Sequence, residues 1–279
     1  MMSLFHNVSE ECSRAVTRRY STSFASAIKL LHKDLRAPIY NIYGFVRFAD
    51  EIVDTFHDYD KENLLHSFEE ETWKAIHAKI SLNPILHSFQ QTVWQYNIPH
   101  DLIRSFLHSM RMDLYKAQYH TVKEMDEYVY GSAEVVGLMC LCVFCEGDLK
   151  RFDKLKESAQ KLGAAFQKIN FLRDIQADFN GLNRSYFPNF DYYKFDDKAK
   201  RDIEQDIEAD FRSSLAGIRS LPWKARFGVY TAYRYYYALF NKIRHMKPKR
   251  VLEQRVRVPD YQKAFIVFSA GLSNRFNLI

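Results

Sequence analysis

The chain has 279 residues, 47% of them hydrophobic, with 22 Phe and 18 Tyr but only 9 Gly and 7 Pro. This length is ample for a continuous core, and the few chain breakers, together with long apolar-periodic runs and no alternating strand-and-turn pattern, predict an all-α protein. The net charge of +6 suits an anionic partner, such as a phosphorylated substrate, nucleic acid or an acidic membrane surface, without choosing among them.

Helical periodicity begins near Ser9, and a turn at 32–34 ends a short second helix. Longer helices are predicted, in chain order, at 35–55, 61–80, 84–96 and 100–117. The sequence "TVKE", residues 121–124, is a capping box that opens a helix running to about residue 145. After it come helices at 151–178, 196–218, 223–246 and 260–270, with a turn-rich loop at 179–193. No linker divides these elements, so we expect a single domain over residues 1–279.

The first residues, "MMSLFHNVSEECSRAV", are too polar for a secretory signal. The longest apolar run, "VVGLMCLCVFC" at 135–145, is too short to span a bilayer. We therefore expect a cytoplasmic protein, soluble or held peripherally on the membrane. In that run Cys140, Cys142 and Cys145 point in different directions on a helix and have no further ligand nearby. We expect small apolar residues in a reducing compartment there rather than a metal site.

Carboxylates interrupt an otherwise apolar helix in "YGFVRFADEIVD", residues 43–54. Tyr43, Arg47, Asp50 and Asp54 are spaced 4, 3 and 4 apart and share one helix face, while the other faces are apolar. A helix that is apolar on most sides is normally enclosed by protein, so this stripe is expected to face an internal cavity. Unpaired carboxylates there would cost several kcal/mol each, so a cationic partner is required.

A second stripe repeats the pattern in "AAFQKINFLRDIQAD", residues 164–178. Gln167, Asn170, Asp174 and Asp178 are spaced 3, 4 and 4 apart on an apolar background, and Arg173 borders them. All-oxygen clusters of this kind suit Mg²⁺, which keeps positions for water and substrate phosphate. Either stripe alone would fit an ordinary solvated helix face, but two stripes with the same pattern favour a functional site.

Several short motifs, in order, carry a resemblance to a known family. "YSTSF" begins at Tyr20, "DEIVD" at Asp50, "RMDLYKAQY" at Arg111, "YVYGSAEVVGLM" at Tyr128, "NFLRDIQAD" at Asn170 and "RSYFP" at Arg184. In this combination the sequence resembles the squalene/phytoene synthase family over about residues 12–263. The resemblance implies an isoprenoid synthase-type helical bundle around a central cavity.

The resemblance also implies site residues and a cofactor. It assigns binding of Mg²⁺, with Mn²⁺ as an alternative, and through it of diphosphate, to Asp50, Asp54, Asp174 and Asp178. It assigns substrate contacts to Ser21, Ser23, Phe24, Tyr43, Arg47, Tyr130, Gln167, Asn170, Arg173, Tyr236 and Arg255. It places Tyr186 among the catalytic residues, on a loop that could close over the diphosphates. In "AEVVG", Glu134 and Val135 depart from the smaller residues usual there, which puts the chain-length preference in doubt.

The activity that the resemblance implies joins two geranylgeranyl diphosphates head to head into phytoene, through a cyclopropyl diphosphate intermediate, for carotenoid synthesis without NADPH. A squalene or dehydrosqualene synthase that uses two farnesyl diphosphates is the nearest alternative, and a non-enzymatic relative is a further one. The basic stretch at 242–259 is interpreted either as a solvated face or as a surface that contacts anionic lipid. No motif supports nucleic-acid binding, and the sequence leaves the oligomeric state open.

Overall fold

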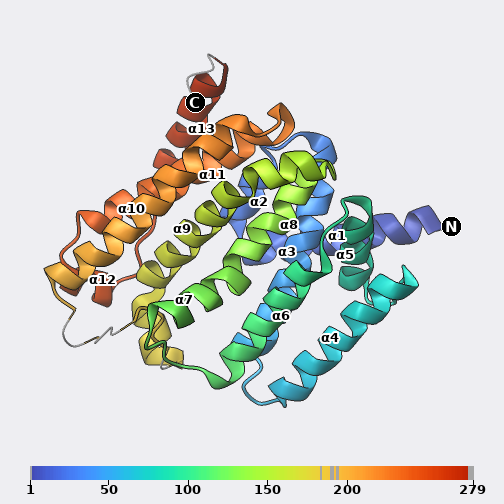
Figure 1. The fold of residues 1–279 in the computed structure, drawn as a ribbon, viewed down its shortest axis with the longest axis horizontal. Coiled ribbons are helices and arrows are strands. Elements are labelled where there is room, and N and C mark those ends of the chain that lie inside the picture. Colours follow the sequence, from blue (N-terminus) through green and yellow to red (C-terminus); the bar gives the residue numbers. More distant parts are fainter. Residues whose placement is uncertain (1, 183, 189–191, 193–194, 276–279) are drawn as a thin grey trace.

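The computed structural model of the protein describes residues 2–182, 184–188, 192 and 195–275 (Figure 1). These residues form a bundle of helices without a β-strand, which confirms the all-α prediction. In chain order the elements are α1 (Met2–Tyr20), α2 (Thr22–Ile28), α3 (Lys33–Asp54), α4 (Lys61–Ala78), α5 (Pro84–Gln95), α6 (His100–Tyr115), α7 (Val122–Val129), η1 (Tyr130–Glu134), α8 (Val135–Phe144), α9 (Leu149–Leu182), α10 (Asp197–Ser220), α11 (Trp223–Arg244), α12 (Pro248–Glu253) and α13 (Asp260–Arg275).

Helix starts follow the capping residues in the sequence. The Thr121 hydroxyl accepts the Glu124 backbone N–H, and the Glu124 carboxylate accepts the Thr121 N–H, so the predicted capping box opens α7. The Asn83 side chain likewise accepts two backbone N–H groups at the start of α5, where Pro84 takes the first helical position. These local hydrogen bonds are why the two helix starts could be located from sequence.

Three boundaries differ from the sequence prediction. Helix α1 begins at Met2 rather than near Ser9, because residues 2–8 have no buried side chain and so show no apolar face, and the buried face that follows carries small hydroxyl residues. One of them, Ser13, exchanges a 2.8 Å hydrogen bond with Ser88 of α5. Helix α9 continues to Leu182, so the first residues of the predicted loop are helical. The six-residue helix α12 was missed, since one and a half turns are too short to show a period.

Helices α3 and α9, which carry the two carboxylate stripes, lie in the interior of the bundle. Helix α3 packs against α1, α5 and α8, and α9 packs against α8, η1 and α10 (Figure 1). Around α3 the core is aromatic: Phe45 stacks on Phe89 at 3.9 Å between ring centroids and is fully buried. Beyond α9, Phe211 of α10 has the same role in a second apolar cluster. Burial on both sides fixes the two stripe-bearing helices firmly in the fold.

The helical run from α7 through η1 to α8 changes its winding in the middle. Residues 130–134 form a π-turn, and a side chain added at Gly131 would lie 1.9 Å from the Ser109 hydroxyl of α6, so only glycine allows this close approach. Joined in this way, Val122–Phe144 is a 23-residue helical run long and apolar enough to cross a membrane, whereas the sequence prediction weighed only the apolar run at 135–145. Half of its most apolar window is buried against other helices, as in the core helix of a globular protein.

Candidate active site

The first stripe lies on α3 as predicted, and its acids are held by an arginine of the same helix. Arg47 donates to Asp50 at 2.5 Å and also pairs with Glu51, one turn on. Its guanidinium lies over the Tyr20 ring, 4.4 Å from the centroid. Burial, and then the charge of neighbouring Asp54, raise the pKa of Asp50 to about 6. The stripe is therefore a partly dehydrated group of carboxylates with an excess of negative charge.

The second stripe lies on α9 and shows the same pairing of acids with arginines. The Asp174 carboxylate accepts a hydrogen bond from the Arg173 Nε at 3.1 Å. It also pairs with the Nε of Arg255, a residue that follows α12, at 2.7 Å. Burial, followed by the charges of Asp174 and Asp54, raises the pKa of Asp178 to about 7. The Arg184 backbone N–H donates to the Asp178 carbonyl at 2.9 Å while the Arg184 side chain donates to Asp54 of α3, so the end of the first stripe lies near the end of the second.

A buried arginine connects the two stripes. The Arg184 Nη1 donates to Asp54 at 2.7 Å, and its charge opposes the rise in the pKa of both Asp50 and Asp178, which burial mainly causes. On its other side the Arg184 Nη2 donates to the Asp113 backbone carbonyl at 2.9 Å, and its Nη1 lies 4.0 Å from the Asp113 carboxylate. Arg184 is thus a fixed internal cation placed beside the carboxylates of both helices.

Asp113 is itself almost completely buried, with 3% of its side chain exposed. Burial is the main cause that raises its pKa to about 7, and Arg184 opposes the rise. The Tyr128 hydroxyl donates to Asp113 at 2.8 Å. The sequence analysis named neither Arg184, Asp113 nor Tyr128 as a site residue, although each lies in one of the quoted motifs. A charged residue within the buried face of a predicted helix, as Asp113 is, was the available signal.

Polar and aromatic side chains continue from the carboxylates along the helices. The Tyr236 hydroxyl of α11 donates to the Asn170 side-chain oxygen at 3.4 Å, and Asn170 in turn donates to Gln167 at 3.4 Å. The Tyr236 ring stacks on Phe166 with 3.9 Å between centroids. The structure therefore brings together three of the predicted substrate residues, from α9 and α11, in one contiguous row.

Helix α2 contributes the predicted Ser-x-Ser-Phe element. Ser21 caps the helix by accepting the Phe24 N–H at 3.3 Å, and its side chain is also hydrogen-bonded to Tyr43. The Phe24 ring stacks on Tyr43 of the first stripe at 5.1 Å, while Ser23 is half-buried on the same short helix. Burial is the main cause of a raised pKa of Tyr43, and the nearby Tyr236 phenol contributes. Side chains of α2, α3 and α11 thus come together around Tyr43 of the first stripe.

Burial raises the pKa of the Cys140 thiol to about 12, and it is also the main cause of a raised pKa of Tyr236. All four cysteines are free, and the described residues hold no group of three His, Cys, Asp or Glu placed to bind a metal.

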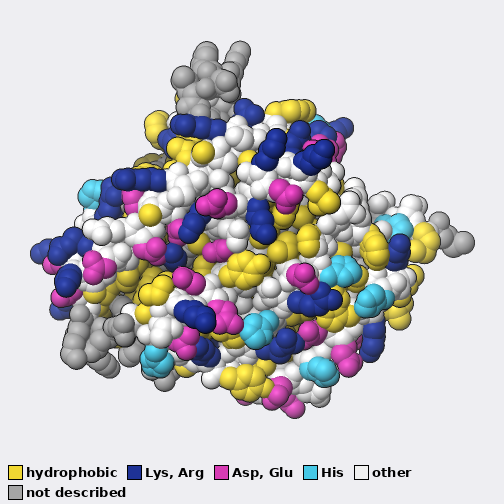
Figure 2. Space-filling model, in the orientation of Figure 1, with side chains coloured by type: hydrophobic (Ala, Val, Ile, Leu, Met, Phe, Trp, Pro, Cys, Tyr) yellow, Lys and Arg dark blue, Asp and Glu magenta, His cyan; other side chains and the backbone are white. Residues whose placement is uncertain are grey.

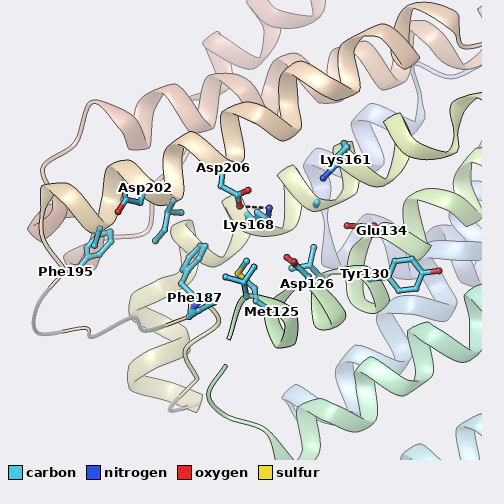
Figure 3. Close-up of a pocket in the computed structure, with 16 residues that line it drawn as sticks. Met125, Asp126, Tyr130, Glu134, Lys161, Lys168, Phe187, Phe195, Asp202 and Asp206 are labelled. Atoms are coloured by element: carbon cyan, nitrogen blue, oxygen red, sulfur yellow. Dashed lines mark ion pairs between the residues drawn. The ribbon is translucent and has the colours of Figure 1, made fainter. Parts of the chain in front are cut away.

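One predicted residue is buried beside the site, and another lies away from it. Tyr186 is 8% exposed and stacks on Phe171 at 4.0 Å and on Tyr128 at 5.3 Å between centroids, so its ring is packed in the core next to Arg184 and the carboxylates. Tyr130 lines a groove of about 1170 Å³ between α7, η1, α9 and α10, away from the stripes (Figure 3). It is Tyr128, two residues earlier, that the fold brings to the site. Glu134 lines the same groove and accepts a hydrogen bond from Gln160 at 2.9 Å.

Three ion pairs join lysines and aspartates in and beside this groove. Lys168 is buried and pairs with Asp206 at 2.5 Å (Figure 3). It also pairs with Asp210 at 2.7 Å. Lys161 also pairs with Asp210, at 3.2 Å. This network joins α9 to α10.

Comparison with known proteins shows to which protein family the chain belongs. The sequence model of the squalene/phytoene synthase family matches residues 17–262. The chain belongs to this family. It is 29% identical to a phytoene synthase of Arthrospira platensis, over 96% of this chain and 94% of the relative. It is 28% identical to a 15-cis-phytoene synthase of Synechocystis sp. (strain ATCC 27184 / PCC 6803 / Kazusa), over 91% and 81% of the two chains.

Solved structures share the fold of this squalene/phytoene synthase family member. A dehydrosqualene synthase aligns with a TM-score of 0.84 at 20% identity and covers 97% of this chain and 98% of its own. A squalene synthase from Alicyclobacillus acidocaldarius aligns with a TM-score of 0.75 at 23% identity, over 86% and 94% of the two chains. These likenesses establish the isoprenoid synthase-type helical fold.

Proposed function

We propose that this protein condenses two molecules of geranylgeranyl diphosphate head to head into phytoene. The observation that carries the proposal is the pair of carboxylate stripes that meet across the bundle beside Arg184. Membership of the squalene/phytoene synthase family supports the reaction class, and the names of the similar curated relatives support geranylgeranyl diphosphate as substrate.

The carboxylate oxygens of the two stripes fit magnesium bound together with diphosphate. Asp50 and Asp54 on one helix, and Asp174 and Asp178 on the other, offer oxygen ligands in pairs, and no three carboxylates of the described residues converge on one point. Magnesium typically takes one or two carboxylates and completes its shell with water and substrate phosphate, so each pair would hold an ion through the diphosphate. When bound, the metal would supply positive charge at the leaving oxygen.

In this proposal the arginines of the site bind the phosphate oxygens of the substrate. Arg47, Arg173 and Arg255 already contact carboxylates of the two stripes, and planar guanidinium groups also bind phosphate oxygens in pairs. We infer that these side chains would leave the acids and turn towards phosphate oxygens when diphosphate is bound. Departure of diphosphate would then be assisted by donors already in place.

The allylic cation formed next needs a dry environment. Phe24, Tyr43, Phe166 and Tyr236 present ring faces in the region where α2, α3, α9 and α11 converge. Ring faces attract positive charge, and a wall of this kind excludes the water that would quench it. The second substrate's double bond would attack the cation there, and the cyclopropyl diphosphate would ionise at the same carboxylates.

Incubation of the purified protein with Mg²⁺ and either geranylgeranyl or farnesyl diphosphate, with and without NADPH, tests the proposal by analysis of the hydrocarbon products. Phytoene from geranylgeranyl diphosphate without NADPH is expected. Asp50→Asn and Asp174→Asn should each reduce its formation by more than about 100-fold, while Asp153→Asn, at an exposed acid on α9, serves as the matched control. A squalene or dehydrosqualene product from farnesyl diphosphate alone would overturn the substrate, and no diphosphate release from either substrate would overturn the enzyme assignment.

A further inference from the structure

Helix α13 exposes a row of aromatic side chains. Tyr261, Phe265 and Phe268 are 79%, 66% and 66% exposed. At 100° per residue they lie within about 60° of one another on the helix surface. The opposite face of α13, with Ile266 and Ala270, is buried. We call the three exposed rings the α13 ridge. Three large rings side by side in water form an apolar patch of the kind that marks a docking surface.

The helix that carries the ridge is firmly attached to the bundle. It runs along α11 in the opposite direction: Lys263 lies over the Tyr235 ring at 6.0 Å, and the Arg234 guanidinium donates to Ser269 at 3.4 Å. In Figure 1, α13 lies on the outer side of α11, at the edge of the molecule where the chain ends. The ridge is therefore presented outward on a fixed support.

Positive charge is concentrated in the same part of the chain. Residues 222–279 contain 12 Lys and Arg and 2 Asp and Glu, a net charge of +10, so the other 221 residues, with 28 basic and 32 acidic side chains, carry −4. Part of this charge lies at the start of α13, where exposed Lys242 donates to the Arg257 carbonyl at 2.7 Å and Arg257 is itself exposed. In Figure 2, hydrophobic and basic side chains lie next to each other near the base of the C-terminal residues drawn in grey.

We propose that the α13 ridge and the basic residues around it dock the protein on a membrane that contains anionic lipid. Aromatic rings suit the boundary between headgroups and acyl chains, and Lys and Arg are attracted to the negative surface. A second copy of the chain is the less favourable occupant, because a two-fold interface would bring the same strongly positive segment against itself. A bilayer with anionic headgroups complements both the apolar ridge and its charge.

This inference stands on different residues from those of the proposed function and is tested without any measurement of activity. The assay is sedimentation of the full-length protein with phosphatidylcholine vesicles, with or without about 30% phosphatidylglycerol, at physiological ionic strength. Binding to the anionic vesicles is expected, with much weaker binding to the neutral ones. Binding should fall as salt is raised, because part of the attraction is electrostatic.

Two variants separate the apolar and the charged contributions. Phe265→Ser combined with Phe268→Ser should weaken vesicle binding by at least about tenfold, because the rings no longer insert. Its control is Tyr59→Ser with Leu82→Ser, which removes two side chains equally exposed elsewhere.

Lys242→Gln combined with Arg257→Gln should weaken binding to anionic vesicles by about 30-fold, which is roughly fivefold for each charge removed. The control is Lys150→Gln with Lys154→Gln, two exposed lysines of α9. All of these side chains are exposed, so thermal melts followed by circular dichroism should coincide with that of the wild type.

Equal binding of ridge and control variants would overturn the proposal, as would failure of the wild type to bind anionic vesicles. Analytical ultracentrifugation gives the other decisive outcome. If the ridge variant converts a dimer into a monomer while vesicle binding is unchanged, the occupant of the ridge is a second copy and the membrane assignment is wrong.

Discussion

Arg184→Met tests whether the buried arginine holds the two stripes together. Arg184 and Asp113 have side chains only 8% and 3% exposed, and removing one partner of a buried ion pair typically costs about 3–5 kcal/mol. Asp113 keeps its hydrogen bond from Tyr128, and its pKa is already raised to about 7, so protonation limits the cost of the unpaired carboxylate. We therefore expect a loss of about 3 kcal/mol, equivalent to a fall in Tm of about 6 °C for a chain of this size.

The assay is urea unfolding of the wild type, Arg184→Met, Asp113→Asn and the double variant. Once Arg184 is gone, the second change removes a carboxylate that is already unpaired, so the two losses should fall short of additivity by at least about 2 kcal/mol. Arg212→Met is the control, because it breaks an exposed pair with Glu208 and should cost less than about 0.5 kcal/mol. Losses that add to within about 0.5 kcal/mol would refute the coupling between the two buried charges.

Further predictions concern the π-turn and the response to pH. Gly131→Ala should destabilise the protein by about 1–3 kcal/mol, since the added carbon would lie 1.9 Å from the Ser109 hydroxyl, while Gly271→Ala, whose added carbon meets only ring atoms at 3.8 Å, should be near neutral in the same urea assay. Burial and neighbouring carboxylates raise the pKa of Asp50 to about 6 and of Asp178 to about 7, so both groups hold protons more tightly in the folded chain than in the unfolded one. Their contribution to stability is fully present below about pH 4 and is lost as the pH rises through 6 to 7. The Tm of Asp178→Asn should therefore increase relative to that of the metal-free wild type as the pH rises over this window. A difference in Tm that stays constant with pH would contradict the raised pKa values.

The features predicted well from sequence are those set by local spacing. The stripe of Asp50 and Asp54 follows from the helical repeat, as does that of Asp174 and Asp178, because an apolar background fixes which face of each helix is turned inward. Capping residues likewise located helix starts, as Thr121 did for α7. The family resemblance then supplied what spacing alone could not: that the two stripes belong to one site.

What the sequence did not indicate depends on contacts between distant segments. Arg184 reaches Asp54 across 130 positions of the chain, and no helical period records such a pairing. Tyr128 and Tyr130 are two residues apart and differ by about 200° in direction on a helix, so the choice between them depends on the winding of a run that passes into a π-turn. The burial of Tyr186 in an aromatic stack was equally hidden, because its segment lies outside any regular helix.

Calorimetric titration of the purified protein with inorganic diphosphate tests most directly whether the two stripes together bind diphosphate through Mg²⁺. Binding is predicted only when Mg²⁺ is present, and it should be lost both in Asp54→Asn, on α3, and in Asp178→Asn, on α9. Binding that persists unchanged in either variant, or that needs no divalent cation, would show that the facing carboxylates do not form one site.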